Sequence, residues 1–174
     1  MSNASNMRLM VTDQFLVNSA QNHADRCVFM HSSKAERKDV GENIWVGSSL
    51  NISDVVWRWD IEKADPACKC PGYYKKCCGH YTQVVWAETF KLGCGISQCD
   101  RVLLEVGDRK PRYSYKYVAV CHYWPGGNIL RFLKNKLQPV RAFEQGRSCS
   151  TCTRMRGGWT PTTCDDGLCS MRKS

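Results

Sequence analysis

Apolar side chains recur every three to four residues near the start of the chain, and this spacing predicts an amphipathic helix that packs one face on the core. Thr12 and Asp13 supply the N-terminal cap, and the helix should continue to about Cys27. The recurring apolar positions of this predicted helix are Phe15, Leu16, Ala20, Ala24 and Cys27.

An extended segment and a second helix are predicted next. Residues 41–45, Gly-Glu-Asn-Ile-Trp, favour an extended conformation, and residues 47–51 favour a turn. Ser53 and Asp54 then cap a second helix, which Pro66 ends because proline cannot continue the backbone hydrogen-bond ladder. This helix runs through Val55, Val56, Trp59 and Glu62.

Two strands are predicted in the second half of the chain, at residues 91–99 and 113–123, joined by a charged segment around Gly107 and Asp108. A short apolar turn that begins at His80 precedes them. Alternation along the second strand predicts a half-buried antiparallel strand. The alternating positions are Tyr113, Tyr115, Tyr117, Ala119 and Cys121.

Beyond Asn128 the apolar residues no longer recur at helix or strand spacing, and the C-terminal region contains few apolar residues. Residues 138–146 are typical of a linker, and residues 149–169 contain four cysteines in a very short element. An element that small depends on cross-links for its order. We therefore divide the 174 residues into one domain at 1–137 and a cysteine-rich extension at 138–174.

Twelve cysteines in a chain of this length predict a disulfide framework and an oxidising compartment, so the protein is expected to be secreted and extracellular. A reduced zinc–thiolate protein is the alternative, but none of the cysteine spacings forms a paired knuckle of the usual length. The spacing alone does not determine which cysteines pair. The first residues, MSNASNMRLM, contain no signal-peptide core, and the chain has no apolar run of about 18 residues that would span a membrane.

The formal net charge of +9 favours anionic partners such as sulphated glycans or a membrane surface. The lysines and arginines are scattered, however, with only mild local density at residues 131–136 and in the tail, which is also typical of a plain soluble basic surface. Basic residues do not alternate with aromatic ones as they do in nucleic-acid-binding platforms, so we expect no nucleic-acid partner.

Two long motifs organise the chain: GHYTQVVWAETFKLGCG at residues 79–95 and YVAVCHYWPGGNI at residues 117–129. Together they resemble the signatures of the CAP superfamily, which includes cysteine-rich secretory proteins, wasp-venom antigen 5, plant pathogenesis-related proteins and parasite venom-allergen-like (SCP/TAPS) proteins. The resemblance covers nearly everything from Ala4 to Cys169. Motifs of this length are poorly explained by chance.

The resemblance implies an α+β fold, an α-β-α sandwich with a central antiparallel sheet, followed by a short disulfide-rich C-terminal hinge. The first helix of the family has no counterpart in this sequence, and its loss would expose apolar surface on the remaining helices. The family's bridges imply four pairs in this chain, and Cys68, Cys70, Cys77 and Cys78 are left to pair among themselves in an unassigned order. The implied pairs are Cys27–Cys99, Cys94–Cys121, Cys149–Cys164 and Cys152–Cys169.

By the same resemblance, His31, His80, Glu42 and Glu62 occupy the family's cleft tetrad. Two imidazoles that face water can hold zinc or another divalent cation reversibly, while the two carboxylates orient the ligands or bound water. Two alternatives stay open: a hydrogen-bonded polar network without metal, and a metal-dependent hydrolase or protease that uses the tetrad.

Other serines and histidines give weaker indications of a functional role. Ser32 and Ser33 adjoin His31, but no nucleophile elbow surrounds either serine, so a serine-based triad is rejected. His23 is expected on the exposed side of the first helix, and His122 is expected to point away from Cys121, neither of them as a ligand.

The resemblance also implies binding of a sterol or a fatty acid, or an immunomodulatory host or receptor protein as partner, without enzymatic activity. The candidate apolar lining is Trp57, Trp59, Val84, Val85 and Trp86, although such residues more often form core. A protein-interaction module with a vestigial cleft is a further alternative. Asn51-Ile52-Ser53 is an N-glycosylation sequon in a predicted turn, and Asn3-Ala4-Ser5 is a weaker one.

Overall fold

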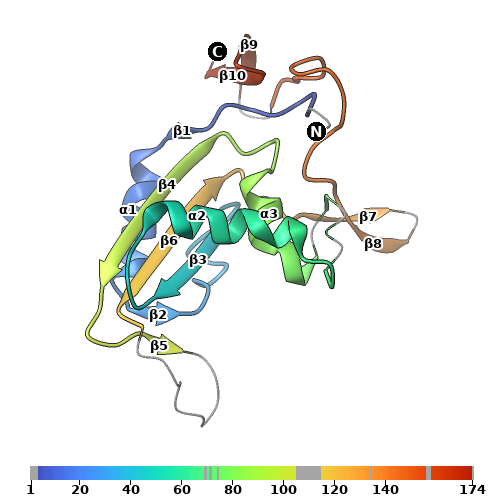
Figure 1. The fold of residues 1–174 in the computed structure, drawn as a ribbon. Helices are drawn as coiled ribbons and strands as arrows, with labels where there is room; N and C mark the ends of the chain where they lie inside the picture. Colours follow the sequence, from blue (N-terminus) through green and yellow to red (C-terminus); the bar gives the residue numbers. More distant parts are fainter. Residues whose placement is uncertain are drawn as a thin grey trace.

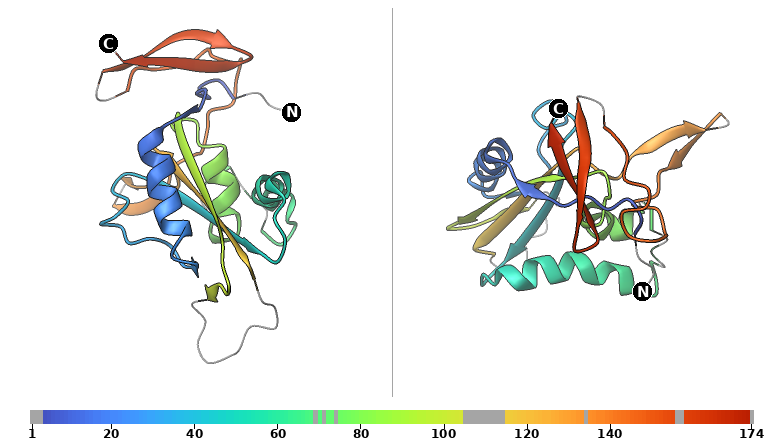
Figure 2. Two further views of the ribbon diagram at one scale, coloured as in Figure 1. Left: turned by 90° about the vertical axis from the view of Figure 1, so that its left-hand side faces the viewer. Right: turned by 90° about the horizontal axis from the view of Figure 1, so that it is seen from above.

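The computed structural model describes residues 4–68, 70, 72–73, 75–104, 115–133, 135–155 and 158–173, and its main body is an α-β-α sandwich (Figure 1). A four-stranded sheet of order β1-β4-β6-β3 forms the middle layer. The strands pair antiparallel apart from β1, which lies parallel to β4. In the view from above, α1 covers one face of the sheet and α2 covers the other (Figure 2).

The elements of the sandwich are β1 (Val11–Thr12), α1 (Gln14–Ala24), β3 (Gly41–Gly47), α2 (Ile52–Ile61), α3 (Gly79–Val84), β4 (Lys91–Gln98) and β6 (Tyr117–Trp124). The 3-10 turns are η1 (Glu62–Ala64) and η2 (Lys76–Cys78). Three two-stranded ribbons complete the described part: β2 (Val28–Phe29) with β5 (Leu103–Leu104), β7 (Leu130–Leu133) with β8 (Lys136–Pro139), and β9 (Trp159–Asp165) with β10 (Leu168–Lys173).

Helix α1 is capped as predicted but is shorter than predicted. The Asp13 carboxylate accepts a hydrogen bond from the Leu16 backbone N–H, which satisfies one of the free donors at the helix start. The helix ends at Ala24 rather than at about Cys27, because Cys27 has a φ of 55°, outside the right-handed helical region. Leu16, Ala20 and Ala24 supply its buried apolar face.

The Gly-Cys-Gly sequence of β4 allows α1 to lie directly on the sheet. A Cβ atom at Gly93 would lie 2.1 Å from the Val17 backbone nitrogen, and one at Gly95 would lie 2.3 Å from the Gln21 Cα atom. Both distances are far shorter than the van der Waals contact of a Cβ atom with a neighbouring backbone atom. Only glycine, which has no Cβ atom, therefore permits this approach. The intervening Cys94 points to the other face, where it forms a disulfide with Cys121.

Helix α2 begins at Ile52, two or three residues earlier than the sequence indicated. Its cap is Asn51, whose Oδ1 accepts hydrogen bonds from the backbone N–H groups of Ser53 and Asp54, so the prediction of Ser53 and Asp54 as the cap was wrong. The two predicted cap residues lie in the first turn instead, where the Asp54 carboxylate favours the positive end of the helix dipole. The helix and the following 3-10 turn end before Pro66, as predicted.

Strand β6 is buried on both faces, so the prediction of a half-buried strand was wrong. Val118 and Val120 pack into one core cluster with residues of α1, while Ala119, Cys121 and Tyr123 pack into a second cluster with residues of α2. The physical reason is that β6 is a central strand of a sandwich, and each face of the sheet has its own layer of helix. The predicted start of this strand at residues 113–114 lies outside the described residues.

The C-terminal extension is tied to the sandwich. The backbone of Cys169 bonds to the backbones of Met7 and Leu9, and the Trp159 ring lies 4.7 Å from the Phe90 ring. The expected domain boundary between residues 137 and 138 falls within β8. Among the described residues, no helix is long and apolar enough to cross a membrane.

All twelve cysteines form disulfides. The pairs that the resemblance implied are present, and the four cysteines that it left unassigned pair with one another across the loop before α3. The six bridges are Cys27–Cys99, Cys68–Cys77, Cys70–Cys78, Cys94–Cys121, Cys149–Cys164 and Cys152–Cys169.

Candidate functional site

The Glu42 side chain is fully buried and is held by several donors at the start of β3. His31 Nδ1 lies 2.7 Å from its Oε1 atom, and His122 Nε2 lies 2.9 Å from its Oε2 atom. Ser32 donates to the same carboxylate twice, from its backbone N–H at 3.0 Å and from its hydroxyl at 2.7 Å. These contacts satisfy both oxygens of a carboxylate that has no access to water.

Two further cationic or ionisable groups approach the Glu42 carboxylate. Arg37 Nε lies 3.6 Å from its Oε1 atom, and His23 Nε2 lies 3.8 Å from its Oε2 atom. Burial alone would raise the pKa of Glu42, but hydrogen bonds from His122, His31 and Ser32 and the charge of His23 outweigh burial and hold that pKa well below its usual range. Glu42 is therefore an ionised carboxylate inside the protein.

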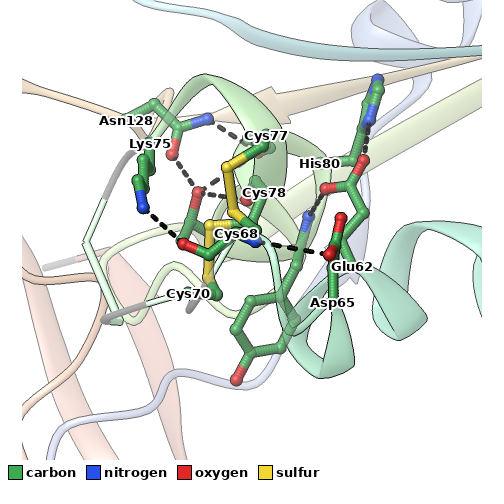
Figure 3. The surroundings of a disulfide bond; sticks show 12 residues. Glu62, Asp65, Cys68, Cys70, Lys75, Cys77, Cys78, His80 and Asn128 are labelled. Carbon is green, nitrogen blue, oxygen red and sulfur yellow. Dashed lines mark hydrogen bonds and ion pairs between the residues drawn. A yellow bond between two sulfur atoms is a disulfide. The ribbon is translucent and has the colours of Figure 1, made fainter.

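His80 and Glu62 form a second histidine–carboxylate pair, carried by α3 and the end of α2. His80 Nδ1 lies 2.6 Å from Glu62 Oε1, and the Tyr81 backbone N–H donates to Glu62 Oε2 at 3.0 Å (Figure 3). The Trp59 ring stacks on the imidazole, with ring centroids 6.1 Å apart and planes inclined by 17°. The ring of His80 is therefore fixed in orientation by a carboxylate at one nitrogen and an aromatic face beside it.

The cysteine-dense loop positions α3 and its histidine. Cys78 bonds to Cys70 immediately before the helix, and the Thr82 hydroxyl, in the first turns of α3, donates to the Cys78 carbonyl at 3.0 Å (Figure 3). Asn128, from the second sequence motif, donates to the Gly79 carbonyl at 2.8 Å. The short helix is thus held at its start by a disulfide and by side-chain bonds, as a six-residue helix requires.

Strand β3 connects the two histidine–carboxylate pairs. Glu42 contacts His31, and the next residue, Asn43, donates from Nδ2 to the backbone carbonyl of His80 at 3.1 Å. Among the described residues, no hydrogen bond or ion pair joins the side chains of one pair to those of the other. The four tetrad residues are therefore two separate pairs on either side of one strand end.

The chemistry of the donor set fits a divalent cation. Each histidine directs Nδ1 at a carboxylate, which leaves its Nε2 atom without a protein partner in the described part of the chain. A carboxylate at one imidazole nitrogen fixes the tautomer and raises the basicity of the other, as in metal-binding histidines. The side chains of His31 and His80 are 57% and 35% exposed, so both are open to solvent and to an exchanging ion.

Only one group of three or more potential ligand atoms lies within 4.8 Å in the described residues, and it consists of cysteine sulfurs: Cys149, Cys152 and Cys169. Each of these sulfurs is in a disulfide, with Cys164 as the fourth partner. Since thiolates and not disulfides bind metals, this group is part of the disulfide framework. The tetrad itself offers two protein nitrogens, Nε2 of His31 and Nε2 of His80, and water would complete the coordination of a bound ion.

The prediction for His23 was wrong, and His122 has partners that the sequence did not indicate. His23, predicted on the exposed side of α1, is 4% exposed, and its Nε2 bonds to the Met30 carbonyl at 2.8 Å. His122 faces α1 and so points away from Cys121, as predicted; it is 2% exposed and is bonded to Glu42 and to the Ser19 hydroxyl at 3.0 Å, two partners that were not predicted. The segment that follows α1 supplies the partner of His23, and α1 supplies Ser19 as a partner of His122. Local sequence periodicity indicates neither contact.

The serine next to His31 has a structural partner. The Ser32 hydroxyl donates to Glu42 and not to an imidazole, which agrees with the rejection of a serine-based triad.

The residues predicted to line an apolar ligand site do not lie together. Trp59 and Trp86 are core residues at 3% and 2% exposure, while Trp57 is 55% exposed on the outer side of α2.

The model of the cysteine-rich secretory protein (CAP) family matches residues 3–123. The chain belongs to the CAP family. It is 40% identical to protein lon-1 of Caenorhabditis elegans over 98% of this chain and 53% of that protein, and 36% identical to cysteine-rich secretory protein 3 of Equus caballus over 96% of this chain and 61% of that protein. The CAP chain described here thus spans between half and two thirds of the length of these two relatives.

Solved structures agree with this fold. The crystal structure titled NaASP2 with Zn2+ superposes on this CAP chain with a TM-score of 0.68 at 29% identity, covering 97% of this chain and 80% of that one. The crystal structure of Na-ASP-1 superposes with a TM-score of 0.67 at 28% identity, covering 97% of this chain and 39% of that one. The α+β sandwich expected from the two motifs is therefore confirmed.

Proposed function

We propose that this CAP domain is a secreted, non-enzymatic binding protein that holds a divalent cation, zinc or a similar ion, reversibly at His31 and His80. The observation that carries the proposal is the shared arrangement of the two histidines, each with Nδ1 on a carboxylate and Nε2 free. A similar solved structure is titled as a zinc complex. Because the chain offers two nitrogen ligands rather than three or four, the ion is exchangeable and serves no committed catalytic step.

Zinc titration by calorimetry on oxidised, metal-free protein tests this proposal. We expect affinity in the micromolar range that is abolished in the His31→Ala/His80→Ala double variant. Glu62→Gln keeps His80 but removes the charge behind its Nδ1 atom, and we expect roughly 10–100-fold weaker binding from it.

Asp54→Asn is the matched control, since it removes a carboxylate that pairs with Arg58 on the exposed side of α2, away from both histidines. Its zinc affinity should equal that of the wild type. Zinc binding that survives in the double variant would refute the site, and so would a complete lack of binding in the wild type.

A second function is favoured by an exposed apolar strip on the outer side of α2. The strip is formed by Ile52, Val56, Trp57 and Ile61, which are 62%, 48%, 55% and 41% exposed. Contiguous apolar surface of this kind marks binding sites in soluble proteins. We propose that it binds a sterol or a fatty acid, or a host or receptor protein.

Fluorescent sterol and fatty-acid binding, together with lipid extraction from the purified protein, tests the strip. The Val56→Ser/Trp57→Ser variant should bind roughly tenfold or more weakly, because burial of a large apolar side chain is worth about 1.5–3 kcal/mol. Phe132→Ser, which removes an aromatic ring that is 72% exposed on β7, is the matched control and should bind normally. Absence of sterol and fatty-acid binding would exclude the lipid role and leave a protein partner for this strip.

Other parts of the proposal rest on the sequence. The division into a CAP domain at 1–137 and a linker with a hinge-like extension at 138–174 is retained as a proposal. We also propose an N-linked glycan at Asn51: the residue is exposed, and its Oδ1 atom caps α2 while Nδ2 stays available for attachment. Extracellular location is proposed from the twelve cysteines and the family.

A further inference from the structure

The ribbon formed by β7 and β8 projects from the side of the sandwich (Figure 1, Figure 2). All four residues of β7 are exposed, and so are three of the four residues of β8. Both ends of the ribbon are anchored: Asn128 before β7 donates to the Gly79 carbonyl, and the Ala142 carbonyl after β8 accepts from the Ala87 backbone N–H. The ribbon is therefore a projection held at its base.

The strand register divides the ribbon into an apolar face and a basic face. Phe132 pairs with Leu137, and successive side chains on a strand point to opposite faces. The apolar face therefore carries Leu130, Phe132, Leu137 and Pro139. The basic face carries Arg131, Leu133, Lys136 and Gln138.

The apolar face is largely open to water. Phe132 is 72% exposed, Leu137 is 58% exposed and Leu130 is 44% exposed. An apolar pair across two strands stabilises a ribbon by its own contact, but here that contact leaves most of both side chains uncovered. Because a two-stranded ribbon is only marginally stable by itself, an exposed apolar face on one indicates a surface that binds an apolar partner.

The charge on and beside the ribbon has one sign. Residues 109–143 contain no aspartate and no glutamate. Arg131 and Lys136 lie on the ribbon and Arg141 follows it, and none of the three has an ion-pair partner in the described part of the chain. The partner of this surface should therefore be anionic as well as apolar.

Three kinds of partner differ in how well they meet both requirements. A soluble anionic glycan would pair with the cations but would leave Phe132 and Leu137 in water. A second copy of this chain also carries a net charge of +9, so two basic ribbons would repel each other. An anionic lipid surface meets both requirements, because its headgroups attract the cations and its acyl chains take up the apolar side chains.

The ribbon has the length that shallow insertion requires. A strand of four residues spans about 13 Å. Interfacial elements bury their apolar face about 5–10 Å into the boundary between headgroups and acyl chains. The long side chains of Arg131 and Lys136 can then extend to the headgroups while their stems lie along apolar surface.

We propose that the β7–β8 ribbon inserts shallowly into membranes that expose anionic lipid headgroups, with Phe132 and Leu137 among the acyl chains and Arg131 and Lys136 at the headgroups. The rest of the sandwich stays outside the membrane. The proposal depends on neither the cation site nor the α2 strip, and the Phe132→Ser variant should keep its affinity for soluble sterol and fatty acid.

Co-sedimentation of the oxidised protein with lipid vesicles tests the ribbon. The vesicles contain phosphatidylcholine alone, or phosphatidylcholine with about one quarter phosphatidylserine, and neither kind contains sterol or free fatty acid. At about 0.1 M salt we expect binding to the anionic vesicles to be at least about tenfold tighter than to the neutral ones. This binding should weaken at about 0.5 M salt, because salt screens the cations from the headgroups.

The Phe132→Ser variant tests insertion of the apolar face. It should bind the anionic vesicles at least about tenfold more weakly, because the contact loses the transfer of a large aromatic ring out of water. Phe15→Ser is the matched control, since it removes a ring that is 75% exposed on α1, and it should bind like the wild type.

The Arg131→Gln/Lys136→Gln variant tests the position of the charge. It should bind the anionic vesicles about tenfold or more weakly. Its matched control is Arg58→Gln/Lys63→Gln, which lowers the net charge by the same amount at two exposed side chains of α2 and η1. This control should bind close to the wild type.

Three results would refute membrane insertion of the ribbon: no binding to the anionic vesicles, equal binding by Phe132→Ser and the wild type, or equal losses in the two charge variants. The last result would show that net charge alone drives the association. Sedimentation equilibrium tests the competing partner: a dimer that Phe132→Ser abolishes, without vesicle binding, would assign the apolar face to a second copy of this chain.

Discussion

Replacing Glu42 with glutamine is expected to lower the free energy of unfolding by about 3 kcal/mol at neutral pH, since it removes a buried ionised carboxylate from its donors. His31, His122 and Ser32 all direct hydrogens at Glu42, and the amide nitrogen of glutamine would direct hydrogens back at one of them. Urea unfolding monitored by tryptophan fluorescence measures the change.

The same residue makes the stability of the wild type depend on pH, and the stability decreases as the pH falls. The pKa of Glu42 is lower in the folded protein than in the unfolded chain, so the folded state binds fewer protons there. The stabilisation is complete above the unfolded pKa, near 4.3, and is lost as the pH falls from there towards the folded pKa. The glutamine variant should lose this part of the acid dependence.

Glu36→Gln is the matched control for both measurements. Glu36 also has a pKa lowered to about 2, chiefly by its hydrogen bond from Arg26, but its side chain is exposed to solvent. Its removal should change stability little, because water screens exposed ion pairs. If Glu36→Gln and Glu42→Gln lowered the stability equally, the Glu42 cluster would have no special structural role.

The sequence predicts the fold and the chemical types at the site because those depend on local pattern and on long motifs. The cap at Asp13 and the spacing of Leu16, Ala20 and Ala24 are local features, and α1 forms where they indicate. The resemblance supplied His31 and Glu42, which the structure brings to 2.7 Å. Helix α1 depends on residues that are close in the chain, and the contact between His31 and Glu42 depends on an arrangement that the family shares.

The partners of Glu42 could not be predicted in the same way. His122 reaches Glu42 only because β3 and β6 pair in a register that places residue 42 opposite residue 122, a contact across 80 positions. A shift of one residue in that register would turn the His122 side chain to the other face of the sheet. The spacing within either strand contains no information about that register.

His23 shows a second limit of periodicity. The apolar positions of α1 identify one buried face, and a polar residue beside that face is expected to be exposed. The segment after α1 folds back over the helix, and the Met30 carbonyl accepts the hydrogen bond that makes burial of His23 possible. The covering segment has no regular pattern of its own, so nothing in the sequence indicated which side of α1 it would cover.

Removing the Cys27–Cys99 disulfide is expected to have the largest effect on stability, about 4 kcal/mol, in the Cys27→Ala/Cys99→Ala variant. The bridge closes a separation of 72 residues, and in the chain-entropy model a longer loop restricts the unfolded chain more. Cys99 is also 6% exposed within the core cluster on the α1 side of the sheet, so the variant loses packing as well.

The Cys68→Ala/Cys77→Ala variant is the matched comparison. Its bridge closes a separation of only 9 residues, which the same model values at about 2.5 kcal/mol. The neighbouring Cys70–Cys78 bridge already restricts most of that loop, so the measured loss should be smaller still. Thermal and urea unfolding of the two oxidised variants give the order of the losses. An equal or larger loss from the short-loop variant would show that the cysteine-dense loop, through its hold on α3, stabilises the sandwich more than the long bridge does.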